Sequence, residues 1–215
     1  MVRRSIMRTL TTLLAISTIV ASQALGAEQA VPARRTQTPA ACKARGTTIL
    51  ANDLIRIFRG RVLEGGFSYY YCNPRTGTRD TLGSYVPDTG GGIRLVELAG
   101  RYIAYDYLLC AHGHCTGRVG LLDTRTQRLR TFEAEAVPSE LGPAAARSLV
   151  VTAAGSVAWI RARSETPNYE VFAVPPGRRA QLLDRGPAID PDSLAAGGGT
   201  LYWTDEATPR SAAIR

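Results

Sequence analysis

The chain has 215 residues, 20% of them charged, and a formal net charge of +8. Lys43 is its single lysine, so arginine carries nearly all of the positive charge. Arginine forks can bind phosphates, but these arginines are scattered singly through turns and strand ends with acids between them. No basic stripe is visible along the sequence, so we expect no nucleic-acid binding, and biased codon usage in a GC-rich genome accounts for the arginines.

Residues 1–26 carry the features of a secretory signal peptide. Three arginines precede an apolar run from Leu10 to Val20, and small residues lead to a cleavage site after Gly26. Cleavage after Ala24 and an uncleaved anchor are the alternatives, although the run is shorter than the about 20 residues a spanning helix needs. We therefore expect a secreted or extracytoplasmic protein with no membrane insertion after signal cleavage.

Signal removal leaves 189 residues and lowers the net charge to +5, because three arginines and no acid leave. Residues 27–41 are rich in Pro, Ala, Thr and Gln without an apolar period, so we predict a flexible linker there. Residues 42–215 have the length of one ordinary domain, which is usually about 100–200 residues.

Short strands recur at intervals of about 50 residues, close to the length of a propeller blade. The recurring aromatic-rich strands are Leu54–Phe58, Arg101–Tyr105, Ser156–Ile160 and Thr200–Trp203. Their lead-in strands are Thr47–Leu50, Ile93–Leu98, Ser148–Thr152 and Ser193–Ala195. The turns between them are Asn52-Asp53, Gly100, Gly155 and Gly197–Gly199, residue types that tolerate the positive φ of tight hairpins. The run Gly90–Gly92 also reads as a turn, since no phosphate-loop Lys-Ser/Thr follows it.

A second hairpin follows in the first three copies, for instance Phe67–Cys72 with Thr78–Leu82 across the turn at Asn73–Gly77. The fourth copy has room for one more strand, Arg210–Ile214. We therefore predict an all-β fold of four-stranded meander repeats, a small or partial β-propeller of about three and a half units. An open stack of sheets or a sandwich is the alternative, because hairpins must stack to bury their apolar faces.

Three motifs resemble a known family. Gly100–Tyr105, Leu121–Thr126, and Asp192–Ala195 followed by Thr200–Trp203 look like the exported WD40-like, or TolB-type, β-propeller repeats of high-GC Gram-positive bacteria. The resemblance covers roughly residues 45–215. It implies a scaffold for binding and supplies no catalytic residues.

Four cysteines in an exported chain predict two disulfides. Gly113 lets the loop between Cys110 and Cys115 turn back, which favours that pair and leaves Cys42 with Cys72. Two other pairings are compatible with the sequence.

The same loop has a second interpretation, because it holds the two histidines of the chain, His112 and His114, between two thiols. Cys and His are zinc ligands, so a metal site is the alternative. Six consecutive residues do not easily surround a tetrahedral ion, and an oxidising compartment favours the disulfide. We expect no metal, no cofactor and no CxxC-type redox pair here.

The sequence gives little support for a hydrolase active site. A Ser–His–Asp arrangement has to use His112 or His114, and no Gly-x-Ser-x-Gly elbow is present. Carboxylates occur at Asp106, Glu165, Asp190 and Asp192, but nothing in the sequence pairs two of them for glycosidase chemistry; we expect the last two to form a turn.

Tyrosines mark the strands. Alternation predicts that Tyr105 and Tyr107 share one face and that Tyr102 lies on the other. We expect these rings, and Tyr69–Tyr71, to pack in the core more than to form a ligand platform. The sequence thus favours a secreted, non-catalytic binding or scaffold module for an unidentified protein, peptide or glycan, monomeric or weakly self-associating. An exported hydrolase and a metal-binding protein are the alternatives.

Overall fold

The computed structural model describes residue 42 and the ranges 46–61, 65–86, 91–111, 114–138, 146–162 and 168–214. The regular elements of these ranges are β-strands, and no helix in them is long and apolar enough to cross a membrane. The predicted signal peptide (1–26) and linker (27–41) lie outside the described residues.

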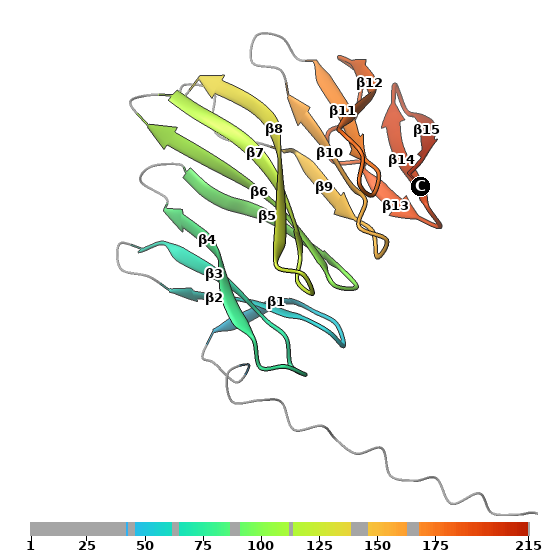
Figure 1. Ribbon diagram of the computed structural model, residues 1–215. Helices are drawn as coiled ribbons and strands as arrows, with labels where there is room; N and C mark the ends of the chain where they lie inside the picture. Colours follow the sequence, from blue (N-terminus) through green and yellow to red (C-terminus); the bar gives the residue numbers. More distant parts are fainter. Residues whose placement is uncertain are drawn as a thin grey trace, which may run out of the picture. The chain divides into compact units, whose positions relative to one another are not determined.

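Antiparallel meanders make up three sheets of eight, four and three strands (Figure 1). The strands are β1 (Thr47–Ala51), β2 (Arg56–Arg61), β3 (Phe67–Cys72), β4 (Arg79–Val86), β5 (Gly91–Ala99), β6 (Tyr102–Ala111), β7 (His114–Asp123), β8 (Arg128–Pro138), β9 (Ser148–Val151), β10 (Val157–Ala162), β11 (Tyr169–Val174), β12 (Gln181–Gly186), β13 (Ala195–Gly197), β14 (Thr200–Asp205) and β15 (Thr208–Ala213).

The strands fall into four units: unit one is β1–β4, unit two β5–β8, unit three β9–β12 and unit four β13–β15. This confirms the predicted all-β meander repeat, with three four-stranded units and a three-stranded last one. Units one and two share one sheet, because a short ladder pairs Tyr85 with Gly92 and Val86 with Gly91. The arrangement is that of a partial β-propeller.

The predicted boundaries of β5 and β13 are wrong. Gly91 and Gly92 begin β5 instead of forming a turn; at Gly92 a Cβ would lie 2.1 Å from the Ser84 carbonyl oxygen, so no larger residue fits. The fourth lead-in strand starts at Ala195 and not at Ser193, because Ser193 closes a turn by donating its backbone amide to the Asp190 carbonyl.

Consecutive units bury their apolar faces against each other. Alternation along β6 sends Ile103 and Tyr105 into a cluster with unit one and Ala104 into a cluster with unit three. Trp159, fully buried, is central to the second of these clusters, and Ala158 and Ile160 join Leu201 and Trp203 in a third. Each four-stranded unit is thus stabilised by its neighbours, as short meanders require.

The aromatic residues pack as predicted. The rings of Tyr105 and Tyr107 lie 5.8 Å apart on one face, and Tyr102 packs against the opposite cluster. Trp159 is stacked between Phe132 of unit two and Phe172 of its own unit, with ring centroids 5.9 and 5.4 Å away. These rings serve the contact between units.

A buried carboxylate joins three strands of unit three. Glu170 on β11 lies opposite Arg161 on β10 and Arg185 on β12, and its oxygens are 2.6 and 2.7 Å from their guanidinium nitrogens. Arg161 also donates a hydrogen bond to the Ala134 carbonyl of unit two. The ion pairs therefore hold unit three together and attach it to its neighbour.

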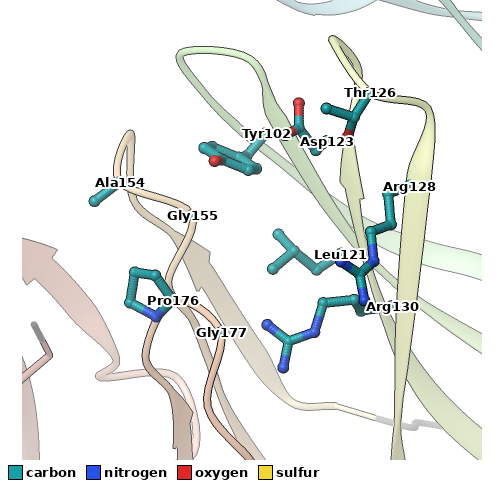
Figure 2. A pocket seen from close by; sticks show the side chains of 10 residues that line it. All are labelled: Tyr102, Leu121, Asp123, Thr126, Arg128, Arg130, Ala154, Gly155, Pro176 and Gly177. Atoms are coloured by element: carbon teal, nitrogen blue, oxygen red, sulfur yellow. The ribbon is translucent and has the colours of Figure 1, made fainter.

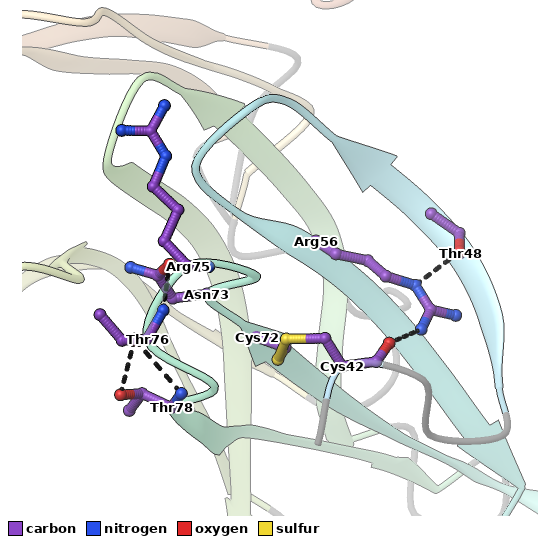
Figure 3. Close-up of a disulfide and its surroundings, with 8 residues drawn as sticks. All are labelled: Cys42, Thr48, Arg56, Cys72, Asn73, Arg75, Thr76 and Thr78. Atoms are coloured by element: carbon purple, nitrogen blue, oxygen red, sulfur yellow. Dashed lines mark hydrogen bonds between the residues drawn. A yellow bond between two sulfur atoms is a disulfide. The ribbon is translucent and has the colours of Figure 1, made fainter. Parts of the chain in front are cut away.

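A disulfide closes the start of the fold. Cys42 is bonded to Cys72 of β3, with Cα atoms 5.5 Å apart and 30 positions between them in the sequence (Figure 3). The Arg56 guanidinium donates to the Cys42 carbonyl at 2.5 Å and to Thr48 Oγ1 at 2.8 Å. In the chain-entropy model a loop of this length contributes about 3 to 4 kcal/mol to the free energy of unfolding.

Candidate functional site

The cysteine-histidine loop lies at the tip of the β6–β7 hairpin. The strand register places Cys110 directly opposite Cys115, and Cys115 is disulfide-bonded. A disulfide sulfur is not a thiolate, so Cys115 is unavailable to the alternative metal site. His112 and the side chain of His114 lie outside the described residues. Among those that are described, no three His, Cys, Asp or Glu residues are grouped to hold a metal ion.

Three of the four carboxylates considered for hydrolysis, Asp106, Asp190 and Asp192, lie in the part of the chain that the structure describes. Glu165 lies outside the described residues. Asp190 and Asp192 share the predicted turn, in which the Asp192 amide donates to Asp190 Oδ1 at 3.0 Å. The hydroxyl of Ser193 donates to the Asp190 carbonyl at 2.7 Å, and that completes the turn. Asp190 thus stabilises the backbone of this turn. Asp192 lines a cavity together with Arg94 and Arg147.

Asp106 has a structural position that the sequence did not reveal. It is fully buried on β6, and its Oδ1 accepts the backbone amides of Arg94 and Leu95 at 3.0 and 2.6 Å. These two residues form a β-bulge in β5, where the register shifts between Ile93 and Val96. Burial raises the pKa of Asp106, although the amides of Leu95, Arg94 and Ala146 and the charge of Arg94 lower it. The carboxyl group therefore holds the bulge in place.

Two cavities meet at this bulge, and a third adjoins the second of them. The first, of about 270 Å³, is lined by Arg94, Leu95, Ala146, Arg147 and Asp192. The second, of about 440 Å³, shares Arg94 and Leu95 with the first and extends over β1. The third, of about 550 Å³, shares Thr47 and Arg59 with the second. We call the residues Arg59, Arg61, Arg94 and Arg147, which line these cavities, the arginine surface.

The arginine surface is positively charged and is not neutralised by direct ion pairs between described residues. None of its four residues makes an ion pair with another described residue, whereas Arg101, Arg161, Arg185 and Arg210 each do. Arg59 lies over the Phe67 ring at 4.6 Å and interacts with the Tyr69 hydroxyl. The acids that line the cavities are Glu97 and Asp192. Guanidinium groups arranged in this way can bind carboxylate or phosphate oxygens through paired hydrogen bonds.

Sequence reasoning missed this site. Arg59, Arg94 and Arg147 belong to β2, the β5 bulge and the segment before β9, so their proximity depends on how the units pack. The available signal was an acid, Asp106, in the otherwise apolar strand Tyr102–Leu109. An acid in such a strand is buried only when hydrogen bonds compensate it.

A groove separate from the arginine surface lies between units two and three. This groove of about 360 Å³ is lined by Tyr102, Leu121, Asp123, Thr126, Arg128, Arg130, Ala154, Gly155, Pro176 and Gly177. Figure 2 shows Arg130 reaching across it toward Gly177. Arg130 donates to the Arg178 carbonyl there, so this guanidinium joins the two units. The groove is thus in part a structural contact.

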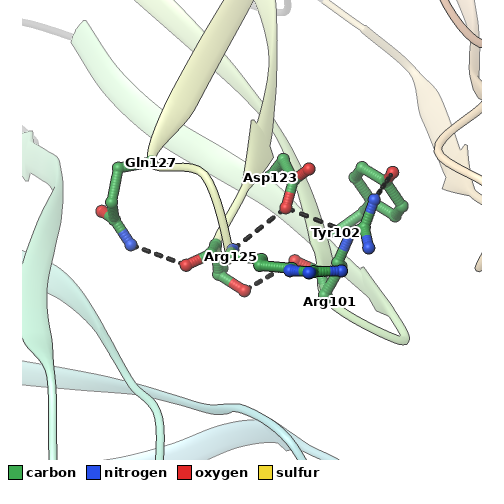
Figure 4. A network of polar contacts seen from close by, with 6 residues as sticks. Arg101, Tyr102, Asp123, Arg125 and Gln127 are labelled. Atoms are coloured by element: carbon green, nitrogen blue, oxygen red, sulfur yellow. Dashed lines mark hydrogen bonds and ion pairs between the residues drawn. The ribbon is translucent and has the colours of Figure 1, made fainter. Parts of the chain in front are cut away.

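The wall of the groove is held by the turn after β7 (Figure 4). Arg101 Nε lies 3.1 Å from Asp123 Oδ1, and its Nη2 donates to the Tyr102 hydroxyl at 2.7 Å. Thr124 Oγ1 donates to the Arg101 carbonyl at 2.8 Å, and Gln127 Nε2 donates to the Thr124 carbonyl at 2.7 Å. The Tyr71 hydroxyl of unit one donates to Gln127 Oε1 at 2.5 Å. The turn that follows Asp123 therefore connects neighbouring strands and joins unit two to unit one.

Comparison with known proteins yields no family. No protein-family model and no curated protein matches the chain. Among solved structures, the β-propeller domain of the Trilobed protease from Pyrococcus furiosus is 13% identical with a TM-score of 0.42, over 53% of this chain and 33% of that one. Uncomplexed Pyrococcus horikoshii acylaminoacyl peptidase is 10% identical with a TM-score of 0.39, over 70% and 34%.

The Nup133 β-propeller domain of Vanderwaltozyma polyspora is 7% identical with a TM-score of 0.33, over 79% of this chain and 55% of that one. The chain therefore spans about one third of the length of the Trilobed protease domain and of the peptidase.

Proposed function

We propose that this chain is an exported binding module without catalytic activity that holds an anionic ligand on the arginine surface. The observation that carries the proposal is the convergence of four arginines, none ion-paired with a described residue, on three adjoining cavities. A concave surface lined by one sign of charge focuses the electric field and attracts ligands of the opposite sign.

Export is supported by two independent features. The first 26 residues have the layout of a signal peptide. The Cys42–Cys72 disulfide and the disulfide-bonded Cys115 favour an oxidising compartment, because cytosolic thiols are kept reduced. The strand register also favours Cys110 as the partner of Cys115.

A purely structural role is the competing explanation, since exposed arginines also keep proteins soluble. It does not account for the carboxyl group of Asp106, which is buried at a cost to fix the backbone of Arg94. The bulge it holds lies where two of the cavities meet. β-Bulges commonly re-aim a side chain at a binding site.

Calorimetric titration tests the proposal. Citrate and inorganic phosphate would be titrated into the mature protein and into Arg94→Ala, Arg147→Ala and Arg75→Ala. Arg75 is an exposed turn residue (Figure 3) that does not line any of the three cavities. We expect binding that weakens with salt, and about tenfold loss for each of the first two variants, since a charge-assisted hydrogen bond is worth about 1.5 kcal/mol or more. Failure of both anions to bind, or equal loss in Arg75→Ala, would contradict the proposal.

A further inference from the structure

The smallest of the three cavities has a charge pattern of its own. Its lining includes two guanidinium groups, Arg94 and Arg147, and one carboxylate, Asp192. The remaining lining residues, Leu95 and Ala146, carry no side-chain charge. The cavity therefore presents two positive groups and one negative group within a volume of about 270 Å³.

A simple anion satisfies this pattern only in part. Its oxygens can bind the two guanidinium groups, which favours binding, but the charge of Asp192 weakens that binding. The side chain of Asp192 is exposed and makes no ion pair with another described residue. A ligand that adds a positive donor beside its carboxylates satisfies all three side chains at once.

From this pattern we infer that the cavity binds an acidic α-amino acid unit, with carboxylates on Arg94 and Arg147 and the ammonium group on Asp192. The inference rests on the proposed function and names its ligand class. Two carboxylates and one ammonium are the charge complement of the cavity. A cavity of this size suits a single residue, because pockets for drug-sized ligands run from about 300 to 1,000 Å³.

Hydrogen bonds fix the backbone of two of the three charged residues, Arg94 and Asp192. Asp106 Oδ1 accepts the amides of Arg94 and Leu95, so a shift of the bulge would leave a buried carboxyl group without these hydrogen bonds. The Asp192 turn is closed by Asp190 and Ser193, and Ser193 Oγ in turn accepts the Thr204 amide at 2.9 Å. Recognition by groups on fixed backbone loses less conformational entropy on binding.

The test compares L-glutamate with glutarate, which has two carboxylates and lacks the ammonium group. Calorimetry on the mature protein should give L-glutamate at least about tenfold higher affinity than glutarate. Asp192→Asn should abolish this preference and leave glutarate binding equal or tighter, because a repulsion has been removed. Asp205→Asn, which removes an acid on β14, should keep the preference, and Arg94→Ala should weaken both ligands.

Each failure has its own meaning. If glutarate binds through the arginines as tightly as L-glutamate, the inference falls and the proposed function stands. Retention of the preference in Asp192→Asn also overturns the inference. If no anion binds, both fall. Glu-Ala amide, in which a peptide bond replaces the α-carboxylate of glutamate, has one carboxylate and the ammonium group. Its binding should be at least about tenfold weaker than that of free L-glutamate, and equal binding would overturn the assignment of two carboxylates to Arg94 and Arg147.

Discussion

The carboxyl group of Asp106 and the backbone amide of Leu95 form a hydrogen bond of 2.6 Å across the β5–β6 pair. The same oxygen accepts the amide of Arg94 at 3.0 Å. A single buried side chain therefore satisfies two donors that the bulge removes from the strand ladder. It also sets the direction in which Arg94 leaves the backbone.

Replacement of Asp106 by Asn should change how stability depends on pH. Burial raises the pKa of Asp106 in the folded state above the ordinary value of 3.8. Its stabilising contribution is therefore full below the unfolded-state pKa and is lost as the pH rises through the raised folded-state pKa. Urea unfolding of both proteins between about pH 3 and 8 should show the wild type losing stability relative to Asp106→Asn as the pH rises. A difference that is flat, or that grows in favour of the wild type, would contradict this.

Glu170→Gln should be strongly destabilising. Removal of one partner from a buried ion pair leaves charge without compensation, and typically costs about 3 kcal/mol or more. Here Arg161 and Arg185 both lose their carboxylate. Chemical denaturation measures the loss. The control is Asp205→Asn, which breaks an exposed pair with Arg210 at 3.4 Å and should cost less than about 1 kcal/mol. Similar losses in the two variants would show that the buried pairs of Glu170 stabilise the protein no more than an exposed ion pair does.

Gly155→Ala should cost more than Gly177→Ala. Both glycines have positive φ, +86° and +71°. Each substitution should therefore lower the free energy of unfolding by about 1 kcal/mol, because alanine is strained in a left-handed conformation. At Gly155 the new Cβ also meets the Tyr102 ring at 2.6 Å, whereas at Gly177 nothing lies within 4 Å. Overpacking of this kind adds about 1 to 3 kcal/mol. Equal unfolding free energies for the two variants would mean that unit three can move away from Tyr102 freely.

The double substitution Glu206→Asn with Ala207→Gly should stabilise the protein. Both residues have positive φ, 50° and 61°, in the turn between β14 and β15. Asn-Gly is the preferred pair for such a turn, and relief of the left-handed strain should add about 1 kcal/mol or more to the free energy of unfolding. Thermal unfolding would record a higher midpoint. An unchanged or lower midpoint would contradict the strain argument.

The sequence was sufficient to predict the β-meanders, but it was not sufficient to predict the arginine surface. Hairpins follow from local features, such as Gly155 between two apolar strands and the alternation of Tyr102 with Tyr105, and these predictions are confirmed. Contacts between units depend on the packing of residues far apart in the chain. For that reason Arg94 lines one cavity with Arg59 and another with Arg147, and no local sequence pattern encodes this arrangement. Glu170 was missed for a different reason: its partners Arg161 and Arg185 lie on adjacent strands of the same unit, and their pairing depends on the exact strand register.

The arginine surface is tested most directly by mapping backbone amide shifts in nuclear magnetic resonance spectra while inorganic phosphate is added at low salt. The account predicts that the largest and saturable shifts occur at Arg94, Leu95 and Arg147, which line the cavity beside the bulge. Shifts confined to Arg128 and Arg130 in the groove between units two and three, or no saturable shift anywhere, would contradict it.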